Sequence, residues 1–193
     1  MNISRVSFKA NYIKPVEILK KDADIKDKKG RIGVNLVELD ANVKDDIDAM
    51  CDVSANWGYF DSLAYDVFDD MDSINKGYVI NRDNAKFYAV TSQKDNFKVL
   101  DANKVLAVAE VAKTDESTIN INYLQVDPMQ LRGAETAEFR HIGTAILNAI
   151  KDLYPFQDIY LRSTNSAKRF YKSQGFEKLK RNSNEFIFRR MKF

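Results

Sequence analysis

Residues 165–176 read NSAKRFYKSQGF and carry the most specific pattern in the chain. Ser166 to Gln174 is predicted to form a short helix. Gly175 ends it, because glycine adopts the left-handed backbone conformation found just after many helices. Phe176–Leu179 then reads as a short strand. This helix, glycine and strand unit is typical of an α/β region in which a helix turns back onto a sheet.

The C-terminal half of the chain alternates between strands and helices. Apolar residues at helical spacing predict a helix over Ile142–Leu153. The strands predicted around it are Val105–Lys113, Thr118–Val126, Asp158–Leu161 and Glu185–Arg190. The first two form a hairpin across the turn residues 114–117, and the last pairs with residues 176–179.

The N-terminal half begins with residues 1–10, which we expect to form a flexible arm. The strands predicted after it are Tyr12–Leu19, Arg31–Leu39, Tyr78–Ile80 and Phe87–Thr91. Pro15 confines the first strand to a sheet edge, because proline has no N–H to donate. Two helices lie between these strands, one capped by Asn42 and one over Tyr59–Met71. The sequence therefore predicts a single α/β domain over residues 11–193, with helices on the faces of a mixed sheet.

Composition excludes several classes of protein. The chain has 193 residues, 45% of them hydrophobic, which is enough for a real core. The net charge of +2 argues against a dedicated nucleic-acid binder. One Cys and one His exclude a disulfide framework and argue against Cys/His metal chemistry, whereas a carboxylate site for a hard cation stays open; no metal-ligating residues are singled out. No apolar stretch approaches the roughly 20 residues of a membrane helix, and no secretion signal opens the chain, so we expect a cytoplasmic protein.

The segment from Val105 to Leu179, within a motif-bearing core of residues 105–180, resembles the GNAT superfamily of acyl-CoA-dependent N-acyltransferases. Three pieces occur in the family's order. They are a strand ending Leu124-Gln125-Val126-Asp127-Pro128, a loop and helix start over residues 138–147, and the stretch at 165–176, which is close to the family's A-x-x-F-Y-x-x-x-G-F. The resemblance implies a mostly antiparallel mixed sheet that splays in the middle, with helices on both faces.

The loop before the helix predicted at Ile142–Leu153 is expected to hold the diphosphate of acetyl-CoA, because N–H groups and the dipole at a helix N-terminus favour anions. The family writes this loop as Q/R-x-x-G-x-G/A, and two registers fit. One puts Arg140 at the Gln/Arg position, with Gly143 and Ala145 as the small residues. The other puts Glu138 and His141 at the Gln/Arg and first glycine positions, and we prefer it because it matches the family's apolar helix positions. The cofactor-binding residues expected in this loop are Glu138, Arg140, His141, Ile142, Gly143 and Thr144.

The resemblance also implies how the rest of acetyl-CoA is bound. Backbone groups of Leu124, Gln125 and Val126 would pair with the pantetheine amides at the splay. The cofactor-binding residues expected in the third piece are Asn165, Ala167, Lys168 and Phe170, with Phe170 mainly a core side chain. The acceptor amine would attack the thioester directly in a ternary complex, so no covalent enzyme intermediate is needed.

The family's tyrosine position is occupied by Tyr171, which the resemblance implies as the acid that protonates the departing thiolate. A phenol is protonated at neutral pH and suits that role. Glu110 and Asp127 are the candidate general bases. Glu110 interrupts an otherwise apolar strand, and Asp127 ends the splayed strand. A chain of water molecules is the alternative to both.

Charge is segregated along the chain. Residues 40–72 hold ten Asp and one Lys, for a net charge of −9, and residues 151–193 carry a net charge of +7. In the family, the two N-terminal helices usually form one wall of the acceptor site. The acidic run would then attract a cationic small-molecule or peptide amine, and basic residues such as Lys168, Arg169 or Lys172 would suit the adenosine 3′-phosphate. The alternative is a pair of solvated helix faces.

Three functions remain open from the sequence. The leading hypothesis is an N-acetyltransferase that moves acetyl from acetyl-CoA to a primary amine. The second is a non-catalytic module with the same fold that binds CoA or a protein. The third is an RNA-associated enzyme acting on aminoacyl-tRNA, although the near-neutral charge disfavours nucleic acid. Dimers are common in the family, which leaves a homodimer open.

Overall fold

The computed structural model describes residues 10–21, 30–78, 84–95, 97, 99–131 and 134–190. Within these residues, nine strands form one sheet in the order β6-β1-β2-β3-β4-β5-β7-β9-β8. The strands are β1 (Asn11–Lys20), β2 (Arg31–Leu39), β3 (Lys86–Thr91), β4 (Val105–Asp115), β5 (Thr118–Val126), β6 (Phe139–Arg140), β7 (Asp158–Arg162), β8 (Glu177–Lys178) and β9 (Glu185–Phe188). Among the described pairs, β5 and β7 run parallel and the others antiparallel. This confirms the expected mixed, mostly antiparallel sheet.

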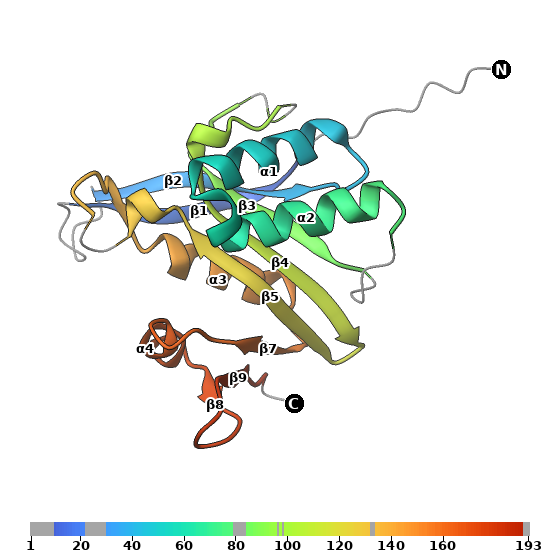
Figure 1. Cartoon of the computed structure of the whole chain (residues 1–193). Coiled ribbons are helices and arrows are strands. Elements are labelled where there is room, and N and C mark those ends of the chain that lie inside the picture. The colour runs from blue at the N-terminus through green and yellow to red at the C-terminus, as the bar shows by residue number, and fades with distance from the viewer. Residues whose placement is uncertain are drawn as a thin grey trace.

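Helices cover both faces of the sheet (Figure 1). Helices α1 (Lys44–Asn56) and α2 (Leu63–Asn75) lie on one face, and α3 (Ile142–Leu153) lies on the other. Met50, Val67 and Met71 bury the first pair against Val37, Ala89 and Val108. On the opposite face, a second core forms around Ile146, Leu147 and Ile150 of α3, with Tyr88 and Ile119 of the sheet. The short α4 (Lys168–Ser173) contributes Tyr171 to this second core.

Two predictions at helix starts are wrong. Asn42 does not cap α1, because Val43 occupies the N-cap position in an extended conformation. The segment Tyr59–Met71 is not one helix. Gly58 and Tyr59 have φ of 108° and 50°, so a short 3-10 turn, η2 (Tyr59–Asp61), precedes α2. The hydroxyl of Ser62 then caps α2 by accepting a hydrogen bond from the N–H of Tyr65 at 3.2 Å.

The other predicted elements are present. The bounds of β2, β5 and α3 match the sequence pattern, and Gly175 ends α4 with φ of 84°. Pro15 lies in β1, near the edge of the sheet, where only Leu19 and Lys20 pair with β6. Strand β6 was not predicted. Of the expected arm and of the run at 78–80, only Ala10 and Tyr78 fall within the described residues, and Ala10 is buried.

Candidate active site

The sheet splits between its two parallel strands. Strand β7 pairs with β5 from Thr118 to Ile121, and the pairing ends there. On its other edge, β5 continues to pair with β4 as far as Val126. Residues 122–126 therefore present one strand edge toward the split. The splay that the resemblance implied is confirmed at this point of the sheet.

A β-bulge marks the point where the split begins. Glu110 of β4 lies opposite Tyr123, and Val111 lies opposite Ile121, so Asn122 is an extra residue in β5. Such an insertion bends the strand and increases its twist, which separates β5 from β7. The bulge also aims Asn122 at Glu110, whose Oε1 accepts a hydrogen bond from the Asn122 amide at 2.7 Å.

Two hollows open at the split. The smaller has a volume of about 80 Å³ and is lined from both faces of the sheet, by Leu63 of α2 and by Tyr171 of α4 among others. The larger, about 350 Å³, is lined by residues of β5, β7 and β9 together with Leu179. Four residues line both hollows, namely Ile121, Asn122, Leu161 and Arg162. Residues of the α2 side and of the α4 side therefore both border the split, and we call the two hollows together the passage.

The start of α3 lies beside this passage. Its N-cap residue, His141, has φ of 63° and places no side chain on the first-turn N–H groups. These N–H groups cannot bond within the helix, so they are available to an anion. His141 thus adopts the left-handed conformation that glycine favours. The side chain of His141 is exposed.

Gly143 joins three parts of the site. A Cβ at this position would come within 3.3 Å of the Phe170 ring in α4 and 3.4 Å of the Val126 methyl in β5. The helix start, the end of the split strand and α4 are therefore in contact around one glycine. The sequence pieces identified separately, at residues 124–128, 138–147 and 165–176, meet here.

Tyr171 is buried in this region and lines the smaller hollow. Its ring contacts Phe170, Phe176 and Phe186, with centroids 5.2, 5.8 and 6.2 Å away. Burial raises the pKa of Tyr171 to about 12. The phenol is therefore fully protonated at neutral pH.

The loop before α3 is fixed by its own hydrogen bonds. The side-chain oxygen of Gln130 accepts from the N–H groups of Glu138 and Phe139 at 2.8 and 3.1 Å. Phe139 and Arg140 form β6 against β1. These contacts fix the direction in which α3 begins. The side chains of Glu138 and Arg140 are exposed.

The remaining predicted residues fall in different places. The carboxylate of Asp127 caps the 3-10 turn η4 (Pro128–Gln130) through the N–H of Met129 at 2.9 Å, and burial raises its pKa. It lines neither hollow.

Glu110 is fully buried, with Asn122 between it and the hollows. The side chain of Gln125 accepts a hydrogen bond from the Ala64 N–H at 2.9 Å, which ties β5 to α2. Asn165 is exposed, and Ala167 lines the smaller hollow.

Sequence reasoning missed Asn122, Arg162 and Leu63, which all line the passage. The bulge at Asn122 had a signal in the sequence. Ile119, Ile121 and Tyr123 alternate regularly, but Leu124 and Val126 continue the alternation one residue out of phase, which a regular strand does not give. Arg162 and Leu63 carry no such signal, because their role depends on which strands diverge.

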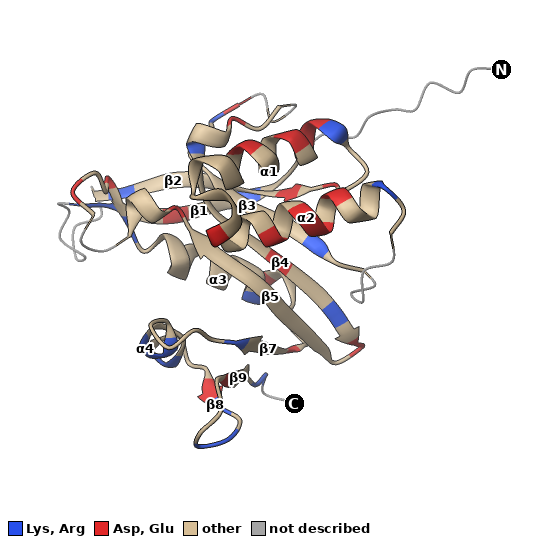
Figure 2. Ribbon diagram, in the orientation of Figure 1, with Lys and Arg blue, Asp and Glu red and all other residues tan. Residues whose placement is uncertain are grey.

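Charge is distributed as the sequence predicts. Figure 2 shows acidic residues along α1 and α2, and basic residues on α4. None of the acidic residues at positions 40–72 lines either hollow. One of them, Asp46, is fully buried and accepts hydrogen bonds from the N–H groups of Ala10 and Asp40 at 3.1 and 2.8 Å. The acidic surface can therefore act on an approaching ligand only from a distance.

Solved structures of acetyltransferases share this architecture. The chain has the GNAT fold. An acetyltransferase of the GNAT family from Staphylococcus aureus is 17% identical, with a TM-score of 0.53, over 82% of this chain and 99% of that one. A protein from Lactobacillus plantarum assigned as an N-acetyltransferase is 11% identical, with a TM-score of 0.50, over 80% of this chain and 94% of that one. The AtaTR complex bound with acetyl-CoA is 15% identical, with a TM-score of 0.42, over 61% and 71%. No protein-family model matches the sequence, and a search of curated proteins gives no match. None of the described helices is long and apolar enough to span a membrane.

Proposed function

We propose that the protein is an N-acetyltransferase that transfers acetyl from acetyl-CoA to a primary amine. The observation that carries this proposal is the passage at the split, with Tyr171 on one side and α2 on the other. A hollow lined from both faces of the sheet suits two substrates that meet there. The catalytic and binding roles given below are part of the proposal.

The residues at the split fit acetyl-CoA. The first-turn N–H groups of α3, at Ile142, Gly143 and Thr144, suit its diphosphate. The strand edge over residues 122–126 suits the two amides of the pantetheine arm, as an added strand would. Lys168, half-buried at the start of α4, suits the adenosine 3′-phosphate by its charge. Bound in this way, acetyl-CoA supplies an activated acyl group to the passage.

The reaction needs one proton to move from nitrogen to sulfur. The neutral amine attacks the thioester carbonyl, the C–N bond forms, and the C–S bond breaks with its electron pair on sulfur. Tyr171 donates its hydroxyl proton to that sulfur and recovers the surplus proton of the attacking nitrogen. Because the pKa of Tyr171 is raised to about 12, a free phenolate is costly. The two proton transfers are therefore expected to be concerted, with Tyr171 acting as a relay.

Glu110 is proposed to act through Asn122. Its carboxylate lies behind the bulge, and the Asn122 amide at 2.7 Å separates it from the hollows. It therefore positions Asn122 and does not take a proton from the amine directly. Asp127, whose carboxylate caps η4, is the less suitable base. Water in the passage is the remaining route for the first proton of an acceptor that arrives as an ammonium ion.

The test separates binding from turnover. Calorimetry with acetyl-CoA, followed by thiol release with a panel of primary amines, should show binding and turnover in the native protein. Tyr171→Phe should keep acetyl-CoA binding and lower kcat by roughly 100-fold to 10,000-fold, because a positioned proton donor contributes that much. The control is Tyr88→Phe, which removes another buried phenol, bonded to Tyr154 at 2.9 Å outside the hollows.

Each outcome has a meaning. Binding without turnover across the panel would favour the non-catalytic module. No binding at millimolar acetyl-CoA would overturn the proposal. Unchanged turnover in Tyr171→Phe would remove Tyr171 from the relay.

A further inference from the structure

The charge inside the passage differs from the charge on the helices above it. Arg162 and Glu185 are the ionisable residues among those lining the larger hollow, apart from the phenol of Tyr160. Arg162 also lines the smaller hollow beside Tyr171. A cation therefore lines both hollows, and the smaller of them also contains Tyr171.

Arg162 is available to a ligand. Its side chain is exposed, and it takes part in no ion pair with another described residue. Its partner across the β7–β9 ladder is Glu185. One oxygen of Glu185, Oε2, accepts a hydrogen bond from the Ser183 hydroxyl at 3.2 Å, and no ion pair joins Glu185 to Arg162. The guanidinium therefore keeps its planar set of donors for another anion.

The neighbours of Arg162 complete a carboxylate site. Alternation along β5 and β7 puts Asn120, Tyr160 and Arg162 on one face of the sheet, since Ile119, Ile159 and Leu161 are buried on the other. The bulge brings Asn122 to the same hollow. Amide, phenol and guanidinium groups all donate hydrogen bonds, and arginine binds carboxylates in a bidentate geometry.

We propose that the acceptor is a free α-amino acid whose carboxylate binds Arg162. This inference rests on the proposed function and names its substrate class. Arg162 lines both hollows, so a carboxylate on it lies close to the reaction centre. One carbon between carboxylate and amine then places the nitrogen in the smaller hollow with Tyr171.

The larger hollow receives the side chain of the amino acid. Its lining by Asn120, Tyr160 and Glu185 favours a polar side chain with hydrogen-bond donors. Glu185, next to Arg162, repels a second negative charge on the ligand, so a monoanionic carboxylate is preferred to a dianionic phosphate. Bond changes are those of the proposed transfer: the α-nitrogen gains the acyl group and its proton passes to sulfur.

The experiment compares acceptors that differ only at the carboxylate. The pairs are L-arginine and L-argininamide, L-glutamine and L-glutaminamide, L-serine and L-serinamide, and glycine and glycinamide, with agmatine as decarboxylated arginine. We expect the preferred free acid to exceed its amide by roughly 10-fold to 100-fold in kcat/KM, the range of a hydrogen bond to a charged group. An α-amide lowers the basicity of its amine and enlarges the neutral fraction, so amine ionisation cannot produce this preference.

Arg162→Gln should abolish the preference, so that a free acid and its amide are used with equal kcat/KM. Arg162→Lys keeps the charge without the bidentate geometry and should retain only part of the preference. Arg181→Gln, in the turn between β8 and β9, is the matched control and should behave as the native protein.

The outcomes distinguish this inference from the proposed function. Equal use of acids and amides, or use of agmatine and other simple amines alone, overturns the amino-acid acceptor and leaves the acetyltransferase standing. Preference for the acid that persists in Arg162→Gln overturns the role of Arg162. Failure of acetyl-CoA to bind overturns the proposed function itself. Melting temperatures of the three variants should match the native protein, because both arginines are exposed.

Discussion

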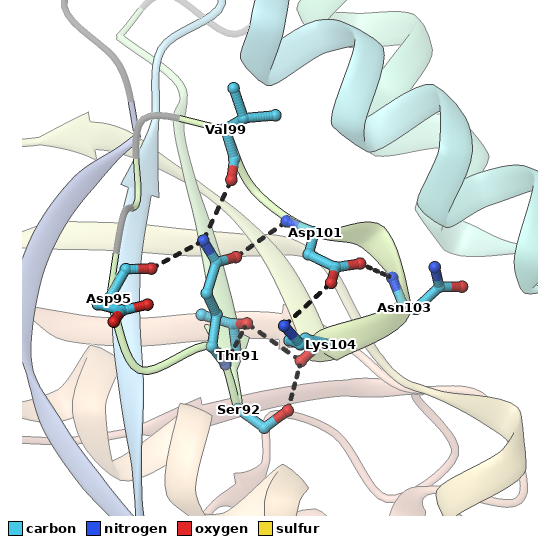
Figure 3. A network of polar contacts seen from close by, with 8 residues as sticks. Thr91, Ser92, Asp95, Val99, Asp101, Asn103 and Lys104 are labelled. Atoms are coloured by element: carbon cyan, nitrogen blue, oxygen red, sulfur yellow. Dashed lines mark hydrogen bonds and ion pairs between the residues drawn. The ribbon is translucent and has the colours of Figure 1, made fainter.

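The strands on the two sides of the β4–β5 pair are joined to the sheet in different ways. On the N-terminal side, β2, β3 and β4 pair without a gap, and a tight network closes the loop between β3 and β4 (Figure 3). Gln93 donates to the carbonyls of Asp95 and Val99 at 3.0 and 3.1 Å, and accepts from the Asp101 N–H at 2.9 Å. On the C-terminal side, β7 pairs with β5 over four residues only.

The continuous half of the sheet is expected to determine stability, and the split half is expected to carry the chemistry. The continuous half buries its backbone groups in regular pairs and supplies a rigid frame. The split half leaves a strand edge, a helix start and a phenol around a passage, and each of these can serve a ligand. Substitutions in the first half should change the free energy of unfolding and leave turnover alone, whereas substitutions at the split should do the reverse.

The largest stability effect is expected at Asp46 in the continuous half. Burial raises its pKa to about 6, against the two N–H groups that lower it, and the nearby Asp40 and Asp45 add to the rise. The unfolded chain loses this proton near pH 4, so the native state holds more protons between about pH 4 and pH 6. Asp46 should therefore lower the free energy of unfolding by up to about 3 kcal/mol as the pH rises through that range.

Chemical denaturation between pH 4 and pH 7 measures this contribution. Asp46→Asn should flatten the fall, because the amide does not ionise. Asp48→Asn, on the same helix but exposed, removes a carboxylate paired with Lys44 and should keep the native slope. The same slope in all three proteins would show that Asp46 does not titrate in this range.

The next effect is expected at Gln93, whose side chain holds the loop between β3 and β4 through its hydrogen bonds to Asp95, Val99 and Asp101. Gln93→Ala leaves three backbone groups without their side-chain partner in a nearly buried site, and should lower the free energy of unfolding by about 2–3 kcal/mol. Ser92→Ala, which removes an exposed hydroxyl bonded to the Lys104 carbonyl at 3.3 Å, should cost less than about 0.5 kcal/mol. Acetyl-CoA affinity should not change in either variant. A loss of affinity in Gln93→Ala would couple the two halves and break the division.

Regular elements could be predicted from the sequence because their periodicity is local. The apolar residues of α3 and the alternation in β2 fix those elements within the chain itself. The motif around Tyr171 also placed α4 and its terminating glycine correctly. By contrast, Arg162 joins the passage only because β7 stops pairing at Ile121, and this divergence depends on a bulge between β4 and β5. Such residues are set by tertiary geometry.

Boundaries failed where backbone conformation overrides residue preference. Tyr59 adopts a positive φ, which non-glycine residues rarely do, so the apolar spacing of its segment suggested a helix that starts too early. The same kind of exception occurs at His141, a non-glycine residue that has φ of 63° at the N-cap of α3. Such conformations are set by the surrounding structure and are not visible in the residue type.

The smallest expected effect tests the split half at Gly143. In Gly143→Ala, the new methyl group meets the Phe170 ring at 3.3 Å and the Val126 methyl at 3.4 Å, so α3 must move away from β5 by a few tenths of an ångström. The strain of roughly 1 kcal/mol is offset by the better helix propensity of alanine, and the free energy of unfolding should change by less than about 1 kcal/mol. Acetyl-CoA affinity should nevertheless fall by roughly tenfold, or about 1.4 kcal/mol, because the first-turn N–H groups shift relative to the strand edge.

Gly33→Ala in β2, where a methyl group meets nothing within 4 Å, is the control and should leave affinity unchanged. If calorimetry gives native affinity for Gly143→Ala, the start of α3 does not hold the diphosphate, and the division between frame and site would have to be redrawn around the strand edge alone.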